Sequence, residues 1–176
     1  TYGYFSSISP TMVAHLTGKV ERLIAYVAPK RGDVVLDIGC NDGTLLNYYG
    51  TEAGLVRVGM DPSAEKFRAN YQSDIRVAYD FFAESGVRKL IGSDSCKIIT
   101  SIAMFYDLDD PLSFIRDISA LLSVDGVWAL ELSYLPLFMK QLSYDQTCHE
   151  HVTYLGLRQM EWMFRQCGLK TLEVSL

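Results

Sequence analysis

The chain has 176 residues, of which 49% are apolar, and a formal net charge of −5 at pH 7. This length and apolar content can bury the core of one domain. The acidic balance argues against a nucleic-acid-binding face, which requires clustered Lys and Arg. No apolar run is as long as a membrane span, no signal peptide opens the chain, and its four cysteines are widely separated. We therefore expect reduced thiols and a cytoplasmic protein that acts neither on a membrane nor on nucleic acid.

Strands and helices are predicted to alternate along the chain. Residues 9–28 have a helical pattern, with Ser9 as N-cap and Pro10 at the first helical position. Apolar residues recur at helical spacing over residues 114–122 and 157–164, and Gly168 is expected to end the second of these helices. Segments with strand composition follow the first helix at 34–38, 55–60, 75–78, 96–102, 127–132 and 169–174. The pattern predicts an α/β fold with a doubly wound, mostly parallel sheet.

The predicted domain organisation is simple. Residues 1–30 are expected to form an N-terminal cap segment and helix, and residues 31–176 the ligand-binding domain. The chain begins with Thr1 and ends in an apolar segment, so we expect a piece of a longer protein. Its first seven residues are rich in aromatic and hydroxyl side chains, and they either cross a ligand cleft or form a disordered terminus.

The most informative segment is Val34–Gly43, an apolar strand followed by a turn with two glycines. Asp37 places a carboxylate at the carboxyl end of this strand, where open α/β sheets bind ligands. Gly39 and Gly43 lack a Cβ, so their backbone can approach a small ligand closely. The spacing differs from the Gly-x-Gly-x-x-Gly of dinucleotide sites, and Asp42 would repel a pyrophosphate. A ligand with an amine and a sulfonium suits the carboxylate, which favours S-adenosylmethionine over NAD.

Two further acidic residues are predicted to contact this cofactor. Asp61 ends the second strand and can accept hydrogen bonds from both ribose hydroxyls, although it can instead cap the helix that follows. Asp80, after the third strand, can reach the adenine amino group. Either Phe81 or Phe82 can stack on the ring, and the other is expected in the core. Residues 101–104 are expected to wall the cleft. The predicted cofactor contacts are Asp37, Gly39, Cys40, Asn41, Gly43, Asp61, Pro62, Asp80, Phe81 and Ser101.

A second group of chemically active residues is Cys148-His-Glu-His151. In an extended segment the two histidines share a face, which would suit a metal, but only the distant Glu131 offers a further ligand. We therefore predict no metal. His and Glu side by side also suit acid–base catalysis, because the pKa of histidine lies near neutrality and a carboxylate can orient the ring. Loop hydrogen bonding is the structural alternative, and the residues alone leave both interpretations open.

Five segments together resemble the sugar C-methyltransferase family, S-adenosylmethionine enzymes that act on nucleotide-linked keto-deoxysugars. These segments follow the family order and are residues 2–7, 37–43, 59–63, 101–108 and 144–151. The resemblance implies that Glu150 and His151 remove the proton next to a ketone and that Tyr4 lies near the substrate. Some members carry tyrosine where this chain has Cys148. The family's zinc-binding N-terminal module, its C-terminal half and the final strand of its sheet are absent from this sequence.

The expected reaction follows from that resemblance. His151, oriented by Glu150, removes a proton alpha to the carbonyl, and the resulting carbanion attacks the sulfonium methyl. A donor such as Tyr4 or Cys148 would stabilise the enolate oxygen. Two alternatives remain, namely an O-methyltransferase acting on a sugar or polyketide hydroxyl and a cofactor-binding module without catalysis. An NAD-dependent oxidoreductase is disfavoured by the turn sequence.

Overall fold

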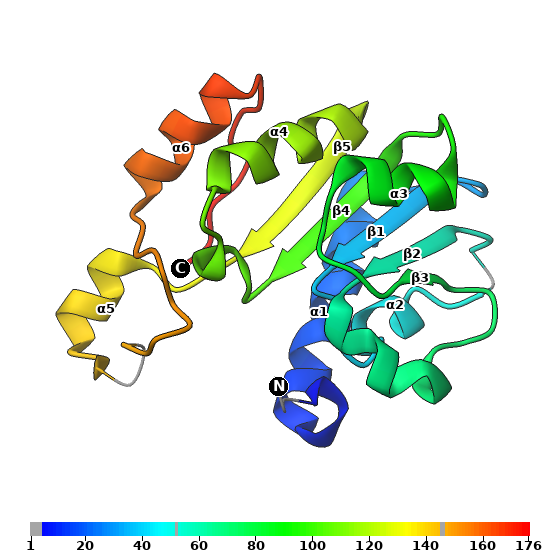
Figure 1. Ribbon diagram of the computed structural model, residues 1–176, viewed down its shortest axis with the longest axis horizontal. Helices are drawn as coiled ribbons and strands as arrows, with labels where there is room; N and C mark the ends of the chain where they lie inside the picture. Colours follow the sequence, from blue (N-terminus) through cyan, green and yellow to red (C-terminus); the bar gives the residue numbers. More distant parts are fainter. Residues whose placement is uncertain (1–4, 52, 145–146) are drawn as a thin grey trace.

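A computed structural model describes residues 5–51, 53–144 and 147–176 of the chain. Five parallel strands form one sheet in the order β3-β2-β1-β4-β5, with helices on both faces (Figure 1). The strands are β1 (Val34–Ile38), β2 (Val56–Met60), β3 (Arg76–Ala78), β4 (Cys96–Ile102) and β5 (Leu122–Glu131). The predicted doubly wound α/β architecture is confirmed.

The structure has helices where the pattern predicted them over residues 9–28, 114–122 and 157–164, and it also has α3 and α5, for which no residue pattern was identified. The α-helices are α1 (Pro10–Val27), α2 (Thr44–Tyr48), α3 (Glu84–Ile91), α4 (Pro111–Leu121), α5 (Leu135–Gln141) and α6 (Leu157–Gln166). Short 3-10 helices are η1 (Ser6–Ile8), η2 (Pro62–Asn70) and η3 (Phe105–Asp107). Ser9 caps α1 by accepting a hydrogen bond from the Met12 amide at 3.3 Å, with Pro10 at the first position as predicted. Gly168, just beyond α6, has a φ of 75° and supplies the predicted stop.

The sheet separates two apolar cores. In β1, Val34, Leu36 and Ile38 face one core while Val35 faces the other, as the two-residue repeat of a strand requires. Helices α3, α4 and α6 cover the first core, and α1 and α2 cover the second. Both faces of the central strands are therefore buried, which explains their nearly continuous apolar sequence.

A buried arginine interrupts that apolar pattern. Arg57 in β2 is 1% exposed, and its guanidinium binds both carboxylate oxygens of Asp74 at 2.6 and 2.7 Å. It also donates to Gln72 Oε1 at 2.8 Å and to the Leu46 carbonyl at 3.2 Å. The charge is thus compensated at one end of the second core.

The predicted sixth strand is absent. Residues 169–174 follow α6 without any strand pairing among the described residues, and Leu172 and Val174 are half-exposed. Strand composition alone cannot satisfy backbone hydrogen bonds, which require a neighbouring strand. The fifth strand begins earlier than predicted. Cys96 of β4 pairs with Leu122 and Ile98 with Val127, so the residues between them on β5 form an irregular protrusion.

Candidate functional site

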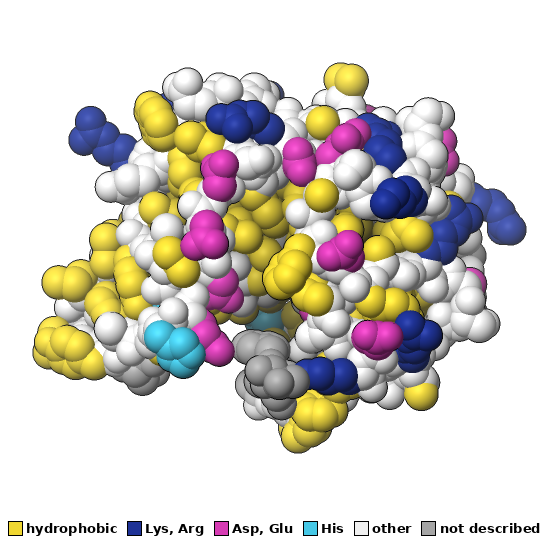
Figure 2. Space-filling model, in the orientation of Figure 1, with side chains coloured by type: hydrophobic (Ala, Val, Ile, Leu, Met, Phe, Trp, Pro, Cys, Tyr) yellow, Lys and Arg dark blue, Asp and Glu magenta, His cyan; other side chains and the backbone are white. Residues whose placement is uncertain are grey.

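The strand order reverses between β1 and β4, because β1 leads outward to β2 and β3 while β4 leads to β5. Ligands of open α/β sheets bind outside the carboxyl ends of the strands at such a reversal. Asp37 and Thr100 face each other there as neighbours in the β1–β4 register. Figure 2 shows a hollow on this face, with acidic side chains on its rim.

The Asp37 carboxyl group is buried, and no cationic side chain in the described part of the chain pairs with it. Asp37 is 4% exposed, and Thr100 Oγ1 donates a hydrogen bond to Asp37 Oδ1 at 2.5 Å. No described Lys, Arg or His forms an ion pair with it. Burial raises the pKa of Asp37 to about 7; the Thr100 hydrogen bond opposes this rise and the charge of Asp61 adds to it. An uncompensated buried carboxylate favours a positively charged ligand.

Asp61 connects two loops at the same edge. Its Oδ2 accepts a hydrogen bond from the Asn41 amide at 2.8 Å, and its Oδ1 accepts one from the Ser63 amide at 2.6 Å. The helix-capping role considered from the sequence is therefore present, with Pro62 at the start of η2. A carboxylate has about four acceptor positions, so two remain for ribose hydroxyls. The two roles are compatible.

The two turn glycines both have a left-handed backbone, with φ of 74° at Gly39 and 79° at Gly43. The space that a Cβ would occupy is not open to a ligand, however. A Cβ at Gly43 would lie 2.7 Å from the Tyr71 ring, and one at Gly39 would lie 3.3 Å from Met104. At Gly43 the missing Cβ makes room for the Tyr71 ring, so any ligand would approach this backbone from another side. There the glycine lets the chain turn beneath Tyr71.

Neighbouring loop residues hold the turn in shape. Cys40 is 3% exposed and its thiol contacts Tyr71 Oη at 3.2 Å, so only its backbone can meet a cofactor. Burial raises the pKa of the Cys40 thiol. Asn41, with a φ of 49°, is also buried. Asp42 accepts hydrogen bonds from the Thr44 amide and hydroxyl, so it stabilises the start of α2.

The N-terminal segment packs against this loop. The Ser6 amide donates to Asn41 Oδ1 at 3.3 Å, and the Ser7 amide donates to Asp42 Oδ2 at 2.8 Å. The Phe5 ring packs edge-on against Phe67 with centroids 4.7 Å apart. Residues 5–8 thus cover one side of the predicted cofactor loop. Tyr4, predicted to lie near the substrate, is outside the described residues.

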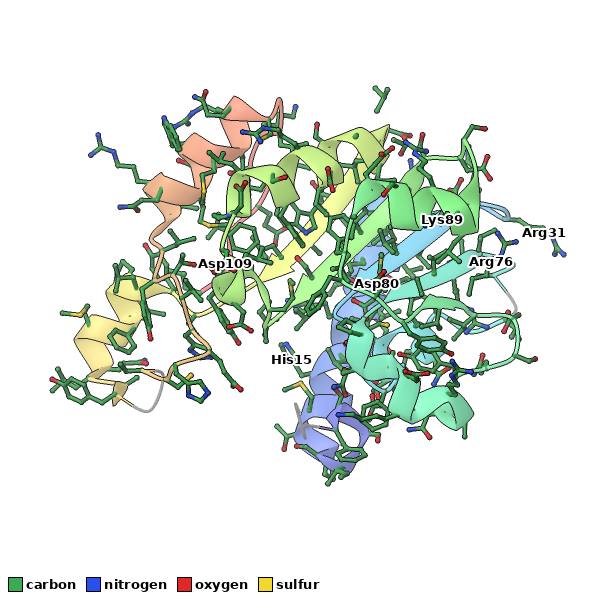
Figure 3. The ribbon with its side chains drawn as sticks, in the orientation of Figure 1. His15, Arg31, Arg76, Asp80, Lys89 and Asp109 are labelled. Carbon is green, nitrogen blue, oxygen red and sulfur yellow. The ribbon has the colours of Figure 1, made fainter. Side chains whose placement is uncertain are left out.

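Of the two phenylalanines considered for adenine stacking, one is exposed and the other packs in the core, as expected. Asp80 follows β3 at the edge where the strands end (Figure 3), is exposed, and accepts a hydrogen bond from the Phe81 amide at 2.8 Å. The Phe81 side chain is 79% exposed and available for stacking. Phe82 instead packs against Phe114 in the core, with ring centroids 4.8 Å apart.

Ser101 does not wall the cleft as predicted. It is fully buried within β4, and its hydroxyl accepts a hydrogen bond from Trp128 Nε1 at 2.8 Å. A parallel strand alternates its side chains between the two faces, and Ser101 falls on the side filled by the β5 tryptophan. Its role is to stabilise the β4–β5 pair.

The second predicted group lies beside the loop after β4. The Tyr106 carbonyl accepts hydrogen bonds from the Val152 and Thr153 amides at 2.9 and 3.0 Å. This pairing brings the half-buried His151 ring over Tyr106, with ring centroids 4.2 Å apart. His151 therefore lies at the carboxyl edge of the sheet, more than a hundred residues from Asp37 in sequence.

Two carboxylates, those of Glu150 and Asp107, lie in the neighbourhood of His151. Glu150 Oε1 lies 4.0 Å from His149 Nε2, and both side chains are largely exposed. Asp107 also interacts electrostatically with His151. Partial burial raises its pKa, while His151 opposes this rise and Glu150 adds to it. Tyr106 and Asp107 were not singled out from the sequence, although both lie in the 101–108 segment.

Two further findings concern metals and membranes. No group of three or more His, Cys, Asp or Glu side chains in the described part of the chain can hold a metal ion. Among the described helices, none has the length and apolarity needed to cross a membrane.

Comparison with known proteins shows which family the chain matches. A family model described as a methyltransferase domain matches residues 12–174. C-methyltransferase NovU from Streptomyces niveus is 26% identical over 174 residues, which cover 98% of this chain and 41% of NovU. The chain therefore spans about two fifths of the length of this curated relative.

Solved structures share the fold. One belongs to the complex between the Haloferax volcanii Trm112 methyltransferase activator and a methyltransferase, with a TM-score of 0.66, 20% identity and coverage of 91% of this chain and 74% of that chain. The plantazolicin methyltransferase BpumL, solved with S-adenosylhomocysteine, has a TM-score of 0.63 at 15% identity, with 88% and 62% coverage. These findings confirm the predicted fold and cofactor. The chain belongs to the S-adenosylmethionine-dependent methyltransferases.

Proposed function

We propose that this protein methylates a carbon next to the ketone of a nucleotide-linked keto-deoxysugar. The relative NovU is named a C-methyltransferase and aligns with nearly the whole chain. The observation that carries the proposal is the placement of His151 against Tyr106, which follows the strand next to the Asp37 strand. A histidine at this edge can reach an acceptor bound next to the cofactor.

The cofactor would be held by the loop between β1 and α2 and by the two buried carboxylates. Asp37 would face its positive charge, Asp61 would accept from the ribose hydroxyls, and Asp80 with Phe81 would hold the adenine. When bound, S-adenosylmethionine supplies an electrophilic methyl group on a positively charged sulfur. Its fit rests on Asp37, because a neutral ligand would leave this carboxylate uncompensated.

The acceptor chemistry would fall to His151. Neutral imidazole takes the proton from the carbon alpha to the ketone, the electron pair left on that carbon forms the bond to the methyl group, and S-adenosylhomocysteine leaves. The tilted ring contact with Tyr106, with an interplanar angle of 51°, restricts the orientation of the His151 ring. Glu150 would orient the ring after a rotation of its exposed side chain, and Tyr4 would lie near the substrate. A positioned base of this kind contributes about 10²–10⁴-fold to the rate.

Deuterium exchange tests this assignment directly. A thymidine-diphosphate-linked keto-deoxyhexose incubated with the protein in D₂O should gain deuterium at the carbon next to the ketone. His151→Asn should slow that exchange about 10²-fold or more and leave S-adenosylhomocysteine affinity unchanged. His149→Asn is the matched control, because the His149 side chain is 92% exposed. Undiminished exchange in His151→Asn would remove His151 from the mechanism.

Product analysis tests the methylated atom. Carbon NMR of the product made from methyl-labelled S-adenosylmethionine distinguishes a methyl group on carbon from one on oxygen by chemical shift. A methyl on oxygen would contradict C-methylation and leave the family activity intact. Cofactor binding without transfer to any keto-deoxyhexose in a substrate panel would contradict the proposed acceptor.

A further inference from the structure

A third charged cluster lies at the carboxyl edge of the sheet, apart from the predicted cofactor residues and from His151. Glu131 ends β5, and His15 Nε2 lies 2.9 and 3.1 Å from its two carboxylate oxygens. Lys19 Nζ lies 2.5 Å from Oε2 of the same group. His15 and Lys19 are four residues apart on α1, so the helix presents both side chains on one face. The cluster ties α1 to the end of β5.

The cluster lies beside the carboxyl ends of β4 and β5. The Glu131 carbonyl accepts a hydrogen bond from the Ala103 amide at 2.9 Å, which joins it to the carboxyl end of β4. Figure 3 shows His15 reaching from α1 toward the ends of these strands. The cofactor carboxylates lie on β1 and β2, so His15 is on the β4–β5 side of the site.

The contact with Glu131 leaves one nitrogen of His15 available. When Nε2–H donates to the carboxylate, Nδ1 of the neutral ring keeps its lone pair and can accept a hydrogen bond. No partner of Nδ1 is found in the described part of the chain, and the side chain of His15 is 39% exposed. Lys19 compensates the charge of Glu131. Burial would raise the pKa of Glu131, but the contacts with Lys19 and His15 outweigh it and lower the pKa.

We propose that His15 is an acceptor-binding residue, with Nε2 held by Glu131 and Nδ1 accepting a hydrogen bond from a hydroxyl of the molecule to be methylated. The inference rests on the methyltransferase activity of the family and not on the identity of the methylated atom. A methyl-accepting molecule with several hydroxyl groups, such as a sugar, can donate a hydrogen bond to Nδ1 of His15. Glu131 acts through His15 and is a positioning residue.

Three variants separate this role from a structural one. His15→Gln keeps a donor for Glu131 and loses the group at the Nδ1 position, whereas His15→Asn keeps a polar atom near that position and loses the donor. Glu21→Gln, an exposed change on the same helix, is the control. The probe is a thymidine-diphosphate-linked keto-deoxyhexose, with initial rates measured at saturating S-adenosylmethionine.

Loss of one hydrogen bond to the acceptor should raise KM about tenfold in His15→Gln, since 1.4 kcal/mol corresponds to a factor of ten. We expect kcat within about threefold, a smaller KM increase in His15→Asn, and unchanged affinity for S-adenosylhomocysteine. A purely structural His15 would reverse the order, because Gln would restore the Glu131 contact. That order, or a KM unchanged in His15→Gln, would overturn the proposal.

A measurement without any acceptor keeps the two proposals apart. Nitrogen-15 NMR of the histidine rings should find neutral His15 as the Nε2–H tautomer, with a change of tautomer ratio in Glu131→Gln. An Nδ1–H tautomer in the wild-type protein would overturn the role of His15 even if keto-deoxyhexoses are methylated. Failure of wild-type turnover with an Nε2–H tautomer would instead count against the proposed acceptor class.

Discussion

Asp37 carries a carboxyl group that the fold buries at the carboxyl end of β1, without a cationic partner among the described residues. Its folded pKa of about 7 lies above the ordinary 3.8, so folding favours the protonated form. The stability that Asp37 contributes is therefore full below about pH 4 and is lost as the pH rises toward 7. The slope of this loss is at most about 1.4 kcal/mol per pH unit.

A bound positive charge reverses this preference, because it favours ionised Asp37. We expect S-adenosylmethionine affinity to rise between pH 6 and pH 8, with release of a proton on binding at pH 6. Calorimetry in two buffers of different ionisation enthalpy measures both effects. Asp37→Asn should weaken binding at pH 8 and flatten the pH dependence, whereas Asp109→Asn, an exposed control, should do neither. Equal affinity at the two pH values in the wild-type protein would contradict this account.

The shape of the turn from β1 into α2 depends on the segments that pack against it as well as on the spacing of its glycines. Tyr71 follows η2, covers the bare face of Gly43 and donates a hydrogen bond to the Asn41 carbonyl at 2.6 Å. The N-terminal segment approaches the same loop through Ser6 and Ser7. The predicted cofactor loop is thus held by two segments, one before α1 and one after η2, that lie far apart in sequence.

Gly43→Ala tests this arrangement. The new Cβ would strain a left-handed backbone and also collide with the Tyr71 ring, so we expect a loss of about 2–4 kcal/mol of unfolding free energy. Gly50→Ala is the matched control, since Gly50 also has a positive φ of 68° but a Cβ added there would meet no described atom within 4 Å. That control should lose only about 1 kcal/mol. Urea unfolding measures both, and equal losses would show that Tyr71 yields without cost.

At the scale of the whole molecule, the site is assembled from both faces of the sheet. The β1–α2 loop and α1 belong to one side, and the segment containing His151 reaches the same edge from the other side through its bonds to Tyr106. A ligand that bridges them stabilises the folded chain as a unit, because it binds only when both sides are in place.

Thermal unfolding measures that linkage. S-adenosylhomocysteine at 100 times its Kd should add about 2.7 kcal/mol, which raises Tm by roughly 5–10 °C for a chain of this length. NAD at the same concentration should leave Tm unchanged, because the turn lacks dinucleotide spacing. The shift should shrink in Asp37→Asn. A larger shift with NAD would contradict the cofactor assignment.

The amino-acid sequence by itself determined the first five strands and the α1, α4 and α6 helices. Buried parallel strands need continuous apolar segments, and the cap at Ser9 and the stop at Gly168 need particular residue types. Residues 169–174 have strand composition but form no strand, because a strand also requires a hydrogen-bonding neighbour that composition cannot supply.

Only the tertiary structure decided which side chains meet. Ser101 faces Trp128 and not the cleft, Arg57 is buried because Asp74 reaches it, and His15 meets Glu131 across more than a hundred residues. Such contacts depend on strand register and on where a helix crosses the sheet, which local patterns do not encode. The cofactor class was predictable from one strand and the turn after it, because Asp37, Gly39 and Gly43 lie close together in the sequence. On the proposed acceptor side, the resemblance already indicated Glu150 and His151. The contacts of His151 with Tyr106 and of His15 with Glu131 join distant segments, so only the folded chain shows them.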